Sequence, residues 1–68
     1  MQRKRWKLYY KLFGYDDASD RFGELSQLQF VVGNTKPEDL LYINLCHIDD
    51  DGEEEIVASS HKSIMELK

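Results

Sequence analysis

The segment from Leu40 to Ile48 limits the fold more than any other part of the sequence. Its apolar residues occupy both sides of an extended chain, with Leu41, Ile43 and Leu45 on one face and Tyr42, Cys46 and Ile48 on the other. A strand that is apolar on both faces usually lies in the centre of a sheet. We therefore expect a sheet in which residues 40–48 have a neighbouring strand on each side.

A turn signal follows this segment directly. Asp51-Gly52 is a favoured two-residue hairpin loop, because aspartate tolerates positive φ and glycine prefers it. With this loop, Asp50 faces Glu53, Asp49 faces Glu54 and the returning strand places residue 57 opposite residue 46. The sequence thus predicts a hairpin whose end is lined by like charges.

Residues 5–13 predict a further strand, because they are rich in aromatic residues and partly alternate. Trp6, Leu8, Tyr10 and Leu12 share one face of this strand. Gly14 to Asp20 is typical of a turn. We expect the face that starts at Trp6 to contribute to the core.

Residues 20–32 fit two patterns. Phe22, Leu25 and Leu28 have helical spacing, whereas Leu28, Phe30 and Val32 alternate as in a strand. We favour a strand over 26–32. In the connection that follows, Thr35 and Glu38 have the spacing of a capping box, with a proline between them, and predict one helical turn.

The tail, residues 59–68, fits either a last strand or a short helix capped by Ser59 or Ser60 and docked through Ile64, Met65 and Leu67. The predicted fold class is therefore mainly β or α+β. It is one small domain, residues 1–68, with an antiparallel sheet of four or five strands, a C-terminal acidic hairpin and at most one short helix. A content of 41% hydrophobic and 12% aromatic residues is too apolar for a disordered chain.

Charge is distributed unevenly along the chain. The first thirteen residues carry five of the nine basic side chains, and the remaining 55 carry four basic residues against all thirteen acidic ones, a local net charge of −9. Six carboxylates crowd the expected hairpin: Asp49, Asp50, Asp51, Glu53, Glu54 and Glu55. Directly opposed like charges cost about 0.2 to 1 kcal/mol per pair in an antiparallel sheet.

We predict that these six residues bind a basic protein surface, including one that normally binds nucleic acid, and that they speed association with it. The chain would then be a non-enzymatic interaction module, such as a small inhibitor or regulator of the phage-encoded type. Two simpler interpretations compete with this one. The charges could protect a sheet edge from aggregation, or they could pair with the basic first strand.

The alternative function is nucleic-acid binding through the basic, aromatic N-terminus. Its candidate residues are Arg3, Lys4, Arg5, Trp6 and Lys7. Basic side chains neutralise phosphates and exposed aromatic rings stack on bases. The acidic remainder of the chain would repel a phosphate backbone, and a core this small needs Trp6 for itself.

The sequence predicts no enzyme, cofactor or metal. Cys46 and His47 are adjacent on a strand and point to opposite faces, so they cannot form a dyad, whereas Cys46 with His61 is geometrically open. An EF-hand alignment on Gly52 puts His47 and Ala58 where acidic ligands are required. Zinc would need three or four ligands at spacings that the sequence lacks.

Cys46 is the only cysteine, which favours a reducing, cytoplasmic setting. The apolar stretch after the basic start is too short for a signal peptide or a membrane span, and we expect a soluble protein complete as one short reading frame. A symmetric dimer is a further expectation, because self-association adds buried area to a small core.

Overall fold

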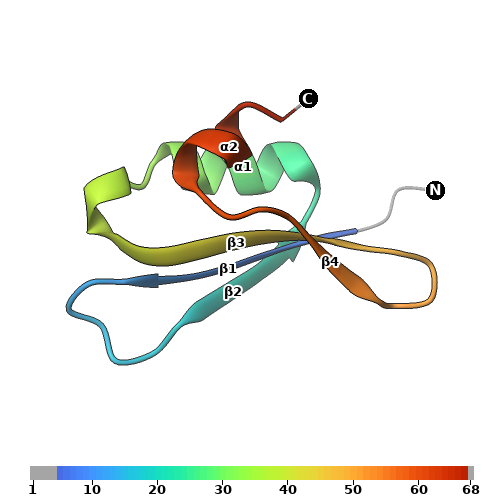
Figure 1. The fold of residues 1–68 in the computed structure, drawn as a ribbon, viewed down its shortest axis with the longest axis horizontal. Helices are drawn as coiled ribbons and strands as arrows, with labels where there is room; N and C mark the ends of the chain where they lie inside the picture. Colours follow the sequence, from blue (N-terminus) through green and yellow to red (C-terminus); the bar gives the residue numbers. More distant parts are fainter. Residues whose placement is uncertain (1–4, 68) are drawn as a thin grey trace.

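In a computed structural model, residues 5–67 are described, and they form a two-layer fold of one sheet and two helices (Figure 1). The sheet is antiparallel with strand order β2-β1-β3-β4. The strands are β1 (Trp6–Leu12), β2 (Ser19–Gly23), β3 (Leu40–Ile48) and β4 (Glu54–Ala58). The predicted fold class, a small antiparallel sheet ending in an acidic hairpin, is confirmed. The expected central position of residues 40–48 is confirmed as well, since β3 lies between β1 and β4.

The core lies between the sheet and the helices. Leu8 of β1 pairs with Leu45 of β3, both side chains are fully buried, and Tyr10 pairs with the buried Ile43. These residues belong to the two apolar faces that the alternation predicted. Leu41 is the exception, because a register shift between Lys11 and Leu12 lets Leu12 pair with Leu40 and leaves Leu41 exposed.

The strand expected over 26–32 is wrong: this segment is part of helix α1 (Leu25–Gly33). Leu28 and Val32, one turn apart, are buried on the sheet, whereas Phe30, which the strand pattern placed beside them, is 73% exposed. The helix begins with a capping box between Glu24 and Gln27. The two periodicities share Leu28 and Val32, so only the cap and tertiary packing decide between them.

Gly23 allows this cap to form. A Cβ atom at this position would lie 2.7 Å from Gln27 Oε1, the atom that accepts the hydrogen bond from the Glu24 amide. A larger residue at the end of β2 would therefore push the Gln27 side chain away from the helix start.

A single 3-10 turn (Pro37–Asp39) precedes β3, as expected from the proline, but its predicted cap is wrong. The N-cap residue is Lys36, without a side-chain cap bond, and the Thr35 hydroxyl instead donates back to the Val31 carbonyl oxygen. Thr35 thus closes the end of α1 rather than the start of the next turn.

The described part of the tail contains a short helix and no strand, which settles the alternative that the sequence left open. Ser60 caps α2 (His61–Met65) by accepting a hydrogen bond from the Ser63 amide. Ile64 is fully buried in the core. Gln29 Nε2 of α1 donates to the Ile64 and Leu67 carbonyl oxygens, which joins the two helices. With α1 and α2 together, the structure contains more helix than the one short helix expected.

Candidate functional site

The β3–β4 loop has three residues, not the two that Asp51-Gly52 predicted. Ile48 pairs with Glu54, and the Asp49 amide donates to the Glu53 carbonyl oxygen at 3.0 Å, so residues 50–52 form the loop. Gly52 has φ of +84°, the left-handed conformation that a three-residue hairpin loop needs at its last position. The sequence signal identified the glycine correctly and misplaced the register by one residue.

Asp49 is the residue that fixes this loop. One of its carboxylate oxygens accepts hydrogen bonds from the Asp51 and Glu53 amides, both at 2.9 Å. This Asx-type arrangement satisfies two loop amides that would otherwise bond to water. Asp49, predicted to bind a partner, therefore has a structural role in the loop.

The register also changes which carboxylates share a face. Glu54 lies on the same side of β4 as Ile56, which pairs with Cys46, whereas Glu55 pairs with His47 on the helix side. The predicted pairs Asp50–Glu53 and Asp49–Glu54 do not form, because Asp50 is inside the loop and Glu54 pairs with Ile48. The three-residue loop therefore removes these two like-charged pairs and places Asp49 opposite Glu53 instead.

Two of the six carboxylates pair with the basic first segment. Arg5 forms an ion pair with Asp50, and Lys7 Nζ lies 3.4 Å from Glu54 Oε1. Although β3 separates β1 from β4, Lys7 and Glu54 reach across it. The internal pairing considered for the sequence is thus present at these two residues, and pairs this exposed contribute at most about 1 kcal/mol each.

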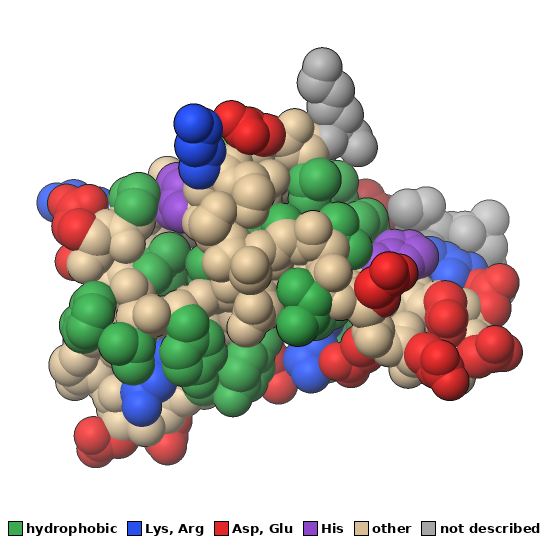
Figure 2. All heavy atoms as spheres, in the orientation of Figure 1, with side chains coloured by type: hydrophobic (Ala, Val, Ile, Leu, Met, Phe, Trp, Pro, Cys, Tyr) green, Lys and Arg blue, Asp and Glu red, His purple; other side chains and the backbone are tan. Residues whose placement is uncertain are grey.

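Three further carboxylates lie on the hairpin, one in the loop, one directly after it and one within β4. Asp51, Glu53 and Glu55 are exposed and form no ion pair within residues 5–67. Figure 2 shows acidic side chains grouped at the end of the molecule where the β3–β4 loop lies in Figure 1. We call Asp51, Glu53 and Glu55 the free carboxylates of the hairpin.

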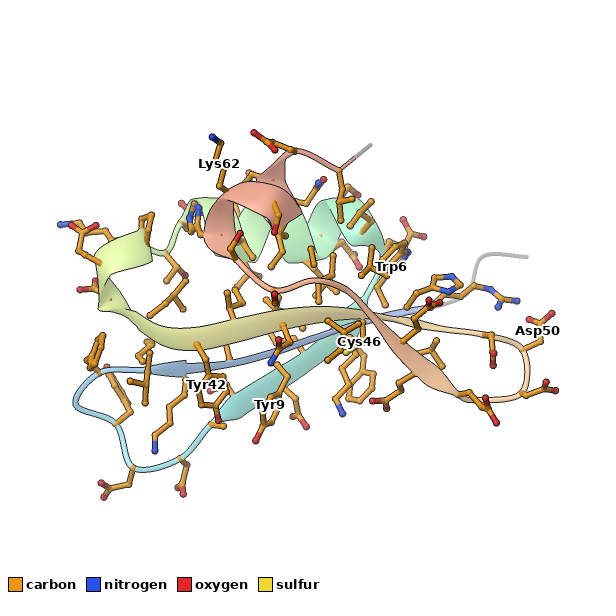
Figure 3. The ribbon with its side chains drawn as sticks, in the orientation of Figure 1. Trp6, Tyr9, Tyr42, Cys46, Asp50 and Lys62 are labelled. Carbon is orange, nitrogen blue, oxygen red and sulfur yellow. The ribbon has the colours of Figure 1, made fainter. Side chains whose placement is uncertain are left out.

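The N-terminal candidate site is only partly described, since Arg3 and Lys4 lie outside the described residues. Arg5 and Lys7 are in the ion pairs with the hairpin. Trp6 points to the helix side of the sheet (Figure 3), packs against the core and meets the His47 ring edge-on, with ring centroids 4.8 Å apart. Trp6 is therefore used in packing and is not presented as an exposed stacking surface.

Cys46 and His61 lie on opposite sides of the sheet, which removes the one dyad that the sequence left open. Cys46 points away from the helices (Figure 3), and His61 Nε2 on α2 is 2.9 Å from the Thr35 carbonyl oxygen. Burial, helped by Glu54 and opposed by Lys7, raises the pKa of the Cys46 thiol. A protonated thiol is a poor nucleophile and metal ligand. Within residues 5–67, no three His, Cys, Asp or Glu side chains gather to hold a metal ion.

A second surface was missed by the sequence reasoning. The sheet face opposite the helices is uncovered by any described residue, and aromatic rings and lysines lie on it (Figures 1 and 3). The register puts Phe22, Lys7, Cys46 and Ile56 in one row across all four strands. Tyr9 stacks on Tyr42, with ring centroids 5.7 Å apart. We call this surface the open face.

Charge and aromatic groups are interleaved on the open face. Lys7 Nζ lies 5.8 Å from the ring centroids of both Tyr9 and Phe22, within range of a cation–π interaction. Hydrogen bonding to Tyr9, together with desolvation, raises the pKa of the Tyr42 phenol. The sequence feature that could have revealed this face is the second apolar side of residues 40–48, formed by Tyr42, Cys46 and Ile48. That pattern indicated a central strand but did not show that no helix of residues 5–67 packs on this side of the sheet.

Comparisons with protein families, curated proteins and solved structures find no significant match to this chain. Among the described residues, no helix is long and apolar enough to cross a membrane.

Proposed function

We propose that the chain is a non-enzymatic protein-binding module that recognises a basic protein surface through the free carboxylates of its hairpin. The observation that carries the proposal is the use of Asp49 to fix the loop. An acidic run in a mobile loop would have to be ordered on binding, at a cost in entropy. In this loop the ordering has already occurred, so more of the interaction energy is available for affinity.

Charge complementarity would act mainly on the rate of association. The free carboxylates concentrate negative charge at the hairpin end of a molecule with net charge −4, and further exposed carboxylates, Asp16, Asp17 and Glu38, lie at the other end. A partner rich in lysine and arginine would be steered to the hairpin end, most strongly at low ionic strength. Carboxylates at fixed spacing could also occupy sites where such a partner binds phosphates. An inhibitor or regulator of a nucleic-acid-binding protein is the role that fits this chemistry.

The nucleic-acid alternative has less support from the geometry. Of its five candidate residues, Arg5 and Lys7 already have carboxylate partners and Trp6 packs at the core. Binding of a phosphate backbone by Arg5 and Lys7 would require breaking these two ion pairs beside an acidic hairpin.

The test compares two variants with the same change in net charge. The hairpin variant carries Asp51→Asn, Glu53→Gln and Glu55→Gln, and the control carries Asp16→Asn, Asp17→Asn and Glu38→Gln. The control residues are exposed and lie at the opposite end of the sheet (Figure 1). Each immobilised form is exposed at low salt to cell lysate, with and without nuclease treatment, and eluted with a salt gradient.

We expect proteins of high isoelectric point to be retained by the wild type and the control and lost from the hairpin variant. Equal retention by the hairpin variant would contradict the proposal. Retention of nucleic acid that disappears on nuclease treatment would instead favour the N-terminal alternative.

A further inference from the structure

The open face has the composition of an interaction surface. Tyr9 and Tyr42 are each 38% exposed, Phe22 is 53% exposed and Ile56 is 62% exposed. These four side chains come from all four strands, so the apolar surface extends across the sheet. A sheet with one face on the core usually presents mainly polar residues on the other. Large apolar groups on that second face indicate that another surface covers it.

The charges of the open face indicate what kind of partner surface could cover it. Lys7 and Lys11 lie on the central strand β1, and Asp20 and Glu54 lie on the outer strands, so the face is neutral although the chain carries −4. A strongly basic partner would meet the lysines, and a nucleic acid would meet the carboxylates. A second copy of the same face carries both positive and negative side chains, so it can place a carboxylate near a lysine and a lysine near a carboxylate.

We propose that the open face binds a second copy of this chain, sheet against sheet, in a two-fold symmetric dimer. Such an interface is isologous, so Lys11 of one copy can approach Asp20 of the other, while Lys7 and Glu54 keep their ion pair within each chain. The stacked pair of Tyr9 and Tyr42 is already ordered in the single chain, which lowers the entropy lost on association. The acidic hairpins repel each other, and this repulsion selects the arrangement with the hairpins at opposite ends of the dimer.

This proposal does not depend on the function of the hairpin. The hairpin tip lies at the end of the sheet, and its free carboxylates stay exposed when two open faces meet. Neutralising Asp51, Glu53 and Glu55 should therefore leave the dimer intact or strengthen it slightly by removing repulsion, whatever the hairpin binds.

The test is sedimentation equilibrium of the full chain over a wide concentration range. Two variants, Phe22→Lys and Ile56→Lys, place a charge on the open face from opposite edges of the sheet. The matched control is Phe30→Lys, which adds the same charge to an exposed ring on α1, in the helix layer. Circular dichroism establishes that each variant is folded, and Ile56→Lys, at the more exposed of the two open-face sites, decides the question if Phe22→Lys unfolds.

We expect the wild type and Phe30→Lys to sediment with twice the chain mass of 8.0 kDa. The dissociation constants of the two open-face variants should rise at least tenfold. A wild type that stays monomeric up to about millimolar concentration would overturn the proposal, as would a folded Ile56→Lys variant that dimerises as tightly as the wild type.

Discussion

Both faces of the sheet carry large apolar residues, but the two faces have different neighbours. On the covered face, Leu8, Ile43 and Leu45 pack beneath α1 and α2 and are buried. On the open face, Tyr9, Phe22, Tyr42 and Ile56 remain accessible to solvent. Apolar alternation alone does not distinguish these faces, because burial depends on which side the helices pack. The covered face therefore supplies the core, whereas the open face keeps its apolar side chains exposed to solvent.

The strongest test of this comparison replaces one residue from each face. Leu45→Ala removes a fully buried side chain and should lower the free energy of unfolding by about 2 to 5 kcal/mol. A core this small supplies only about 3 to 5 kcal/mol in total, so this variant should be largely unfolded. Tyr42→Ala, on the open face, should lower the free energy by about 1 kcal/mol. Urea denaturation at low protein concentration measures both, and equal losses would show that the faces contribute alike.

The hairpin allows a second comparison, between a carboxylate that fixes the loop and one that is free. Asp49→Ala removes the acceptor of two amide hydrogen bonds and should lower the free energy of unfolding by about 1 to 2 kcal/mol. Asp51→Ala, with an exposed side chain, should change it by less than about 0.5 kcal/mol. Amide hydrogen exchange at residues 51 and 53 should accelerate only in Asp49→Ala. The same exchange rates in both variants would contradict the role given to Asp49.

A smaller effect on stability is expected from Cys46, whose side chain is buried although it lies on the open face. Because desolvation raises its pKa in the folded chain, the fold favours the protonated thiol. The contribution of Cys46 to the free energy of unfolding is fully present below the thiol pKa of the unfolded chain, about 8.5. It decreases as the pH rises through the higher pKa of the folded chain. The pH midpoint of the reaction with a thiol reagent should therefore lie above that of the urea-unfolded chain. A midpoint equal to or lower than the unfolded value would contradict this environment.

The sequence predicted those features that local chemistry determines. Alternation located β1 and β3, and Gly52 located the hairpin. Three features of the structure could not be predicted from the sequence: helix α1, the register of the hairpin loop and the open face. Helix α1 has apolar residues that fit both periods, so its capping residues and the sheet beneath it decide the structure. The loop register depends on the hydrogen bonds of Asp49, and the open face depends on both helices packing on the same side.

The sequence predicted which residues form the candidate site, and the structure shows that these residues have different roles. All six hairpin carboxylates lie at the β3–β4 turn, as expected, but they divide into three kinds. Asp49 holds the loop, Asp50 and Glu54 pair with Arg5 and Lys7, and three carboxylates form no ion pair within residues 5–67. No local pattern separates these roles, because each depends on where a distant strand lies.

We propose that the position of the free carboxylates, and not the net charge of the chain, directs binding. The most direct test is the association rate constant of a captured basic protein with the wild type, the hairpin variant and the control, at about 20 and 150 mM salt. We predict that at low salt the hairpin variant associates at least tenfold more slowly than the wild type and the control stays within about twofold, with the difference shrinking at the higher salt. Equal slowing of both variants would show that net charge alone is responsible and would contradict the account.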